Sequence, residues 1–93
     1  MDAFLSFADD LERVLKGQAS LAALLDRAID HGHPQEACSA GLQHFLADAD
    51  IRERDAAYRQ MQELEMQRLI ELLRRHASVS QLASVHFLGS SKC

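Results

Sequence analysis

The sequence predicts an all-α fold, a compact bundle of four principal helices, the last one long, followed by a short C-terminal helix. Apolar residues recur along the chain at intervals of three and four, which places them on one side of a helix. Gly17 and Gly32 follow the first two of these stripes, where glycine favours a helix end. No stretch alternates apolar and polar residues as a strand does.

The first helix is expected to begin after Asp2, whose carboxylate suits an N-cap, and to end at Gly17. Its apolar stripe consists of Phe4, Phe7, Ala8, Leu11, Val14 and Leu15. Ser20 is expected to open a second helix that His31 and Gly32 close. The stripe of this second helix is Leu21, Leu24, Leu25, Ala28 and Ile29.

Pro34 predicts the start of the third helix, because proline lacks an N–H that the first turn would not use. The third stripe is Cys38, Leu42, Phe45, Leu46 and Ala49. At the other end of the chain, Ser78 and Gln81 have capping-box spacing, which predicts a short fifth helix. We expect one domain over residues 1–89 and a frayed tail at 90–93.

The long helix is expected over residues 50–77, because this stretch lacks Gly and Pro and consists mainly of good helix formers. One helix over this range would measure roughly 40 Å. The alternative is a helix that begins at Asp55, with residues 51–54 as a turn. The apolar arc comprises Ile51, Tyr58, Met61, Met66, Leu69, Ile70, Leu72 and Leu73, with Gln62, Glu65 and His76 also inside it.

Composition and charge narrow the function classes. The chain has 93 residues and a net charge of −4, which argues against a nucleic-acid partner. Acids near the N-terminus are unlike a signal peptide, and no apolar run is long enough to span a membrane. Two cysteines make no disulfide framework. We therefore expect a cytoplasmic protein with reduced thiols, and the bias towards Ala, Arg, Leu and Asp is typical of a GC-rich bacterial genome.

Two groups of polar residues are candidates for chemistry. His31, His33 and Cys38 have side chains that can bind zinc, but their spacing matches no established metal site. They predict a turn between two helices, and folding without a metal or cofactor. Tyr58, Gln62 and Glu65 follow one another on the arc of the long helix and predict a polar rim beside a packing seam. A general acid or base at Glu65, or a polar device that fixes the register of a dimer, are the alternatives.

The function predicted by elimination is non-catalytic: a protein-interaction module of the adaptor, inhibitor or immunity type that acts through the long helix 50–77. The contact residues expected are Tyr58, Met61, Gln62, Glu65, Met66, Leu69, Leu72 and Leu73. An overhanging long helix would expose apolar surface, which predicts an antiparallel homodimer. In the alternative, residues 78–88 fold back over the overhang and the protein is a monomer. The competing function is a metal-binding or small enzymatic protein that uses His31, His33 and Cys38.

Overall fold

A computed structural model of the chain describes residues 2–27 and 33–85. Within these ranges the chain forms six helices and no strand, which confirms the all-α class. The helices are α1 (Ala3–Leu15), α2 (Leu21–Leu25), α3 (Pro34–Ala47), α4 (Ala49–Arg54), α5 (Ala56–Arg74) and α6 (Val79–Ala83). None of the described helices is long and apolar enough to cross a membrane.

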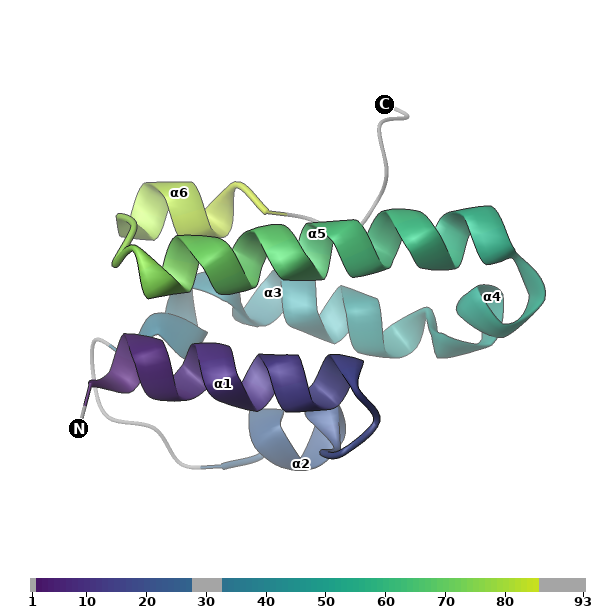
Figure 1. Cartoon of the computed structure of the whole chain (residues 1–93), viewed down its shortest axis with the longest axis horizontal. Coiled ribbons are helices and arrows are strands. Elements are labelled where there is room, and N and C mark those ends of the chain that lie inside the picture. Colours follow the sequence, from purple (N-terminus) through teal and green to yellow (C-terminus); the bar gives the residue numbers. More distant parts are fainter. Residues whose placement is uncertain (1, 28–32, 86–93) are drawn as a thin grey trace.

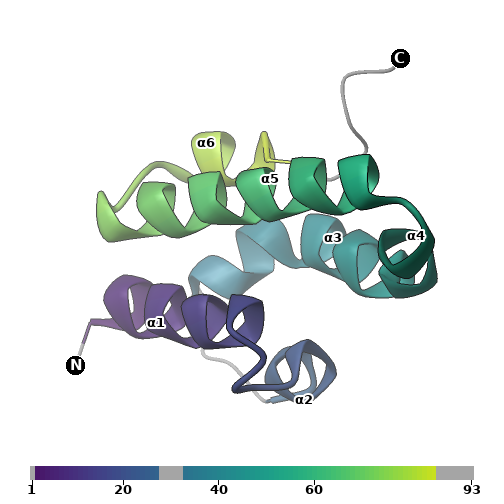
Figure 2. The same ribbon diagram turned by 45° about the vertical axis from the view of Figure 1, so that its right-hand side comes forward.

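The three longest helices lie side by side along the long axis of a molecule that measures 38 × 28 × 18 Å (Figure 1). α1 and α3 run in the same direction, and α5 returns antiparallel to both (Figure 2). α5 packs mainly on α1, whereas α6 packs on α3 and on the C-terminal end of α5. α2 packs on α1 and α3 and lies below the C-terminal half of α1 in Figure 1.

The ends of α1 are formed by the residues that the sequence predicts. The Asp2 carboxylate accepts hydrogen bonds from the backbone N–H groups of Phe4 and Leu5. Gly17 adopts φ +74°, and the Gln18 N–H donates to the Arg13 carbonyl at 2.8 Å. This is the Schellman arrangement, in which a residue of left-handed conformation closes the helix.

α2 is shorter than predicted, because it begins after Ser20 but ends at Leu25. Ala28 to Gly32, which were expected to complete and close it, lie outside the described residues. α3 begins with Pro34 in its first turn, as predicted. The residue before it, His33, serves as its N-cap.

The predicted single helix over residues 50–77 is wrong. The backbone at Asp55 is extended, with φ −128° and ψ 104°, and separates α4 from α5. The Asp55 carboxylate accepts the Tyr58 N–H at 3.0 Å and caps α5, so the alternative start at this residue is confirmed. Residues 51–54 belong to α4 and not to a turn. At about 1.5 Å per residue, the 19 residues of α5 span about 28 Å, so α5 extends less far beyond α1 and α3 than a helix of roughly 40 Å would.

The capping box at the start of α6 is present as predicted, with reciprocal hydrogen bonds between Ser78 and Gln81. Leu82 is 0% exposed and Val85 is 3% exposed, so this segment covers part of the core. The rest of the predicted fold-back, to residue 88, and the predicted tail at 90–93 lie outside the described residues.

One apolar core joins every helix except α4, which contributes no buried residue. Its members are Phe7, Ala8, Leu11, Leu21, Leu24, Cys38, Leu42, Phe45, Met66, Leu69, Ile70, Leu73, Leu82 and Val85. α5 supplies four of them, so its apolar side faces its own chain.

Leu69 and Leu64 of α5 form a matched pair for a test of this packing. Leu69 is 0% exposed and Leu64 is 57% exposed. We expect Leu69→Ala to lower the free energy of unfolding by about 2–5 kcal/mol, because the substitution removes buried area and leaves a cavity. Leu64→Ala should cost less than about 0.5 kcal/mol. Urea denaturation of both variants measures the two costs, and equal losses would contradict the packing of α5.

Candidate functional site

The residues predicted to contact a partner are divided between the core and its rim. Completely buried are Gln62, Met66, Leu69 and Leu73. Half-buried are Tyr58, Met61, Glu65 and Leu72. This corrects the expectation of an exposed apolar arc: the chain's own helices cover the arc, and the four buried residues offer no surface to a partner.

A buried polar cluster joins the end of α3 to α4 and α5. Asp48, at the end of α3, is 8% exposed. Its Oδ2 accepts the Tyr58 hydroxyl at 2.6 Å and the Gln62 Nε2 at 3.0 Å. The Nε2 of His44 lies 3.2 Å from the same oxygen. One carboxylate therefore holds two successive turns of α5 against the C-terminal turn of α3.

Arg52 of α4 completes this cluster. Its Nη1 donates to the Gln62 Oε1 at 2.6 Å and to the Phe45 carbonyl. Its guanidinium also lies 3.8 Å from the centroid of the Phe45 ring, a cation–π geometry. Burial lowers the pKa of Arg52, against the opposing effect of the Asp48 charge. We call Asp48, Tyr58, Gln62, Arg52 and His44 the Asp48 cluster.

The Asp48 cluster differs from the polar group that the sequence predicts. Tyr58 and Gln62 do lie together, since the Gln62 Nε2 donates to the Tyr58 oxygen at 3.2 Å. Glu65 is not their partner, because it forms an ion pair with Arg68 at 3.6 Å. Sequence spacing missed Asp48 because it lies on a different helix, and helical periodicity carries no information about contacts between helices.

The predicted metal alternative is not supported by the positions of His33 and Cys38. The His33 Nδ1 accepts the Gln35 N–H at 3.0 Å, and its ring packs edge-on against Phe7. Cys38 is buried, and its thiol donates to the Pro34 carbonyl at 3.3 Å. Burial raises the pKa of the Cys38 thiol to about 12, which opposes the thiolate that a metal requires.

The described residues contain no group of three His, Cys, Asp or Glu side chains placed to hold a metal ion. His31, the third member of the predicted group, lies outside the described ranges.

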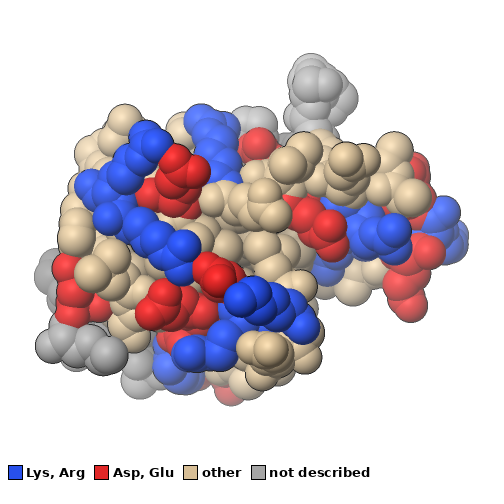
Figure 3. Space-filling model, in the orientation of Figure 1, with Lys and Arg blue, Asp and Glu red and all other residues tan. Residues whose placement is uncertain are grey.

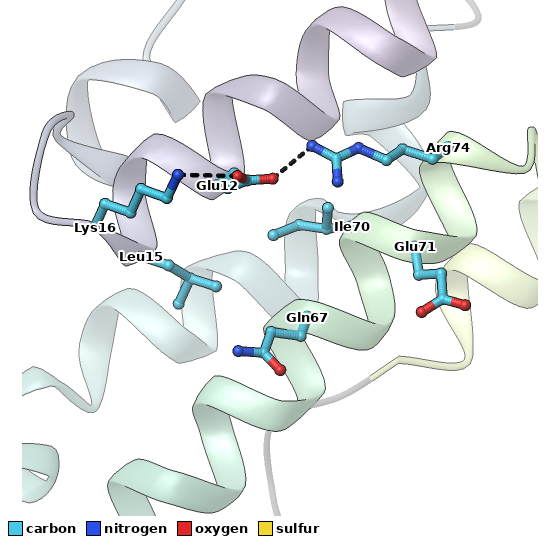
Figure 4. Close-up of a pocket in the computed structure, with 7 residues that line it drawn as sticks. All are labelled: Glu12, Leu15, Lys16, Gln67, Ile70, Glu71 and Arg74. Carbon is cyan, nitrogen blue, oxygen red and sulfur yellow. Dashed lines mark hydrogen bonds and ion pairs between the residues drawn. The ribbon is translucent and has the colours of Figure 1, made fainter.

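A hollow of ≈ 650 Å³ lies between α1 and α5 (Figure 4). It is lined by Glu12, Leu15, Lys16, Gln67, Ile70, Glu71 and Arg74. Figure 4 shows the apolar side chains of Leu15 and Ile70 between the two helices, with charged groups around them. The floor of this hollow is therefore apolar and its rim carries both signs of charge.

The rim of this hollow also ties the two helices together. Arg74 of α5 forms ion pairs with Asp9 at 3.2 Å and with Glu12 at 2.5 Å, both on α1. The bond from Arg74 lowers the pKa of Glu12, and the pair with Lys16 at 3.1 Å lowers it further. These groups are already paired within the chain.

A second hollow, of ≈ 390 Å³, lies on the other side of α5. It is lined by Leu64, Gln67, Arg68, Glu71, Leu72 and Arg75. Gln67 and Glu71 border both hollows and form a ridge between them. We call the exposed surface formed by Leu64, Gln67, Arg68, Glu71 and Arg75 the outer face of α5. It lies opposite the buried arc, and helical periodicity does not identify it, because charged residues interrupt its apolar positions.

Charged side chains on this side of the molecule are unevenly distributed. Figure 3 shows Lys and Arg gathered over the C-terminal end of α5, with uncharged side chains over its middle.

No family model, curated protein or solved structure matches the chain. The geometry of the outer face and of the Asp48 cluster therefore carries the functional argument alone.

Tyr58, the only tyrosine of the chain, gives a direct test of the Asp48 cluster. We expect its pKa to lie above 10.0, because the hydrogen bond to Asp48 favours the protonated phenol. This bond stabilises the fold at every pH below 10.0, and the contribution is lost as the pH rises through the raised pKa.

Phenolate absorbance measured against pH reports this value for the wild type and for Asp48→Asn. The pKa should fall towards 10.0 in Asp48→Asn, because a neutral amide oxygen accepts the phenol's hydrogen bond more weakly than a carboxylate and the negative charge beside the phenol is removed. An unchanged pKa in this variant would contradict the role of Asp48.

Proposed function

We propose that this chain is a small non-catalytic protein-binding module, and that it contacts its partner through the outer face of α5. The long helix remains the proposed binding element, but with its opposite side as the contact surface. The observation that carries the proposal is the shape and chemistry of this face. Two hollows flank one ridge: the hollow towards α1 has an apolar floor, and the second is lined mainly by polar and charged side chains beside Leu64 and Leu72.

The outer face of α5 combines an exposed apolar side chain with exposed charged and polar groups, a combination that protein interfaces share. Interfaces combine apolar contacts at the centre with a polar rim that fixes orientation. Leu64, a large apolar side chain that is 57% exposed, lies at the N-terminal end of the face. Arg68 and Arg75 follow it along α5, with side chains 54% and 69% exposed. Arginine is enriched at interfaces because its guanidinium binds carboxylates while its methylene stem packs on apolar groups.

The other polar groups described above form hydrogen bonds inside the fold, and this also supports a binding role. Asp48, Tyr58 and Gln62 bond to one another inside the fold. The Cys38 thiol is buried and hard to ionise. These groups stabilise the helix bundle that presents α5 as a rigid element, which suits an adaptor or an inhibitor.

Site-specific photo-crosslinking in the native cells tests the proposal. A photoreactive phenylalanine analogue replaces Leu64 in one variant and Gln43, an exposed residue of α3, in the control. We expect discrete adducts from position 64 and none above background from position 43. The adduct mass less 10.4 kDa gives the mass of the partner. Absence of adducts from position 64, or equal adducts from both positions, would contradict the proposed surface.

A further inference from the structure

The outer face of α5 carries a regular seam. Six residues recur at alternating intervals of four and three: Ala57, Met61, Leu64, Arg68, Glu71 and Arg75. This spacing averages 3.5 residues and places the side chains along one line of the helix, apolar in its first half (Ala57, Met61, Leu64) and charged in its second (Arg68, Glu71, Arg75). Met61 is half-buried and the other five are exposed, so the described helices leave this seam largely uncovered.

The charges beside this seam reverse along the helix. Residues 55–65 contain three acids and one base, a net charge of −2. Residues 66–75 contain one acid and three bases, a net charge of +2. Arg74 is directed towards α1, which leaves Arg68 and Arg75 as the bases along the seam.

The charge pattern of one α5 helix is complementary to that of a second α5 helix only when the two helices are antiparallel. Two α5 helices packed antiparallel bring each acidic half against the basic half of the other copy. A parallel pair would align like charges. Antiparallel packing also opposes the two helix dipoles favourably. A two-fold axis between Leu64 and Arg68 generates both contacts at once, because an isologous interface uses the same surface twice.

We propose that a second copy of this chain occupies the outer face of α5, with the two α5 helices antiparallel. The proposal rests on the proposed function and names the partner of that surface. Leu64 of each copy lies near the axis, beside the methylene stem of Arg68 from the partner copy. The arginines of the intrahelical pairs Arg68–Glu65 and Arg75–Glu71 are exposed, and solvent screening weakens both pairs, so these arginines can bind acids of the other copy.

The geometry differs from the dimer that an overhanging helix would form. That dimer would bury Met66, Leu69 and Leu73, which are already in the core. The seam described here leaves the core intact and uses a surface of limited area. We therefore expect a reversible dimer that dissociates on dilution through the micromolar range.

Two complementary double variants test this inference. The first, Arg68→Glu with Arg75→Glu, changes the basic half from +2 to −2. The second, Glu63→Arg with Glu65→Arg, changes the acidic half from −2 to +2. Each variant alone then opposes like charges across the antiparallel seam. In a mixture, every half of one variant faces a half of opposite sign on the other.

Sedimentation equilibrium measures the result across a concentration series. For the wild type, we expect a mass above 10.4 kDa that rises with concentration. We expect each double variant to associate at least about tenfold more weakly. An equimolar mixture should recover association close to that of the wild type. Far-ultraviolet circular dichroism of each variant confirms that its helices remain folded.

Two leucine substitutions supply the matched control. Leu64→Asp should abolish association, whereas Leu5→Asp on α1, at a leucine that is 43% exposed, should leave it unchanged. A wild type that stays at 10.4 kDa, or a mixture that fails to recover association, would overturn the antiparallel dimer.

The crosslinking experiment distinguishes a failure of the antiparallel dimer from a failure of the proposed binding function. An adduct larger than two chains from position 64, together with a monomeric wild type, would retain the binding surface and assign it to a different protein.

Discussion

The arrangement of this molecule depends on the hydrogen bonds of one carboxylate, that of Asp48. Asp48 lies where α3 ends, and it accepts bonds from Tyr58 and Gln62 on two successive turns of α5. Because Gln62 shares the buried side of α5 with Met66 and Leu73, holding Gln62 inward also directs these residues into the core. A buried carboxylate without partners is costly, so the cluster strongly favours the one return path of the chain that satisfies it.

The sequence predicts those features that depend on local periodicity and on helix ends. It predicts the all-α class, the caps at Asp2, Ser20 and Ser78, and the stop at Gly17. It leaves two possibilities open at Asp55, because good helix formers on both sides favour a continuous helix whereas Asp55 itself can cap a new one. The cap at Asp55 and the bonds from Asp48 to α5 decide for the break. The bonds from Asp48 join residues on different elements, and no pattern along one helix contains them.

The same limit explains the change in the candidate surface. Periodicity identified the apolar arc of the long helix but not whether its own chain or another chain covers it. The core answers this, since α5 contributes Met66, Leu69, Ile70 and Leu73 to one cluster with α1 and α3. The contact surface that we propose is the opposite side of α5, where Leu64 precedes Arg68 and Arg75. This side is harder to identify from the sequence than the apolar arc, because a helix face with both apolar and charged residues resembles an ordinary solvent-exposed face.

In the proposed dimer α5 serves two purposes: its inner side lies in the core of its own chain, and its outer side packs on a second copy. An isotope-filtered nuclear Overhauser experiment on an equimolar mixture of labelled and unlabelled protein separates contacts within a chain from contacts between chains. We expect the methyl groups of Leu69 and Leu73 to show contacts within the chain only, and those of Leu64 to show contacts between chains. Contacts between chains from Leu69 or Leu73, with none from Leu64, would contradict the proposed dimer.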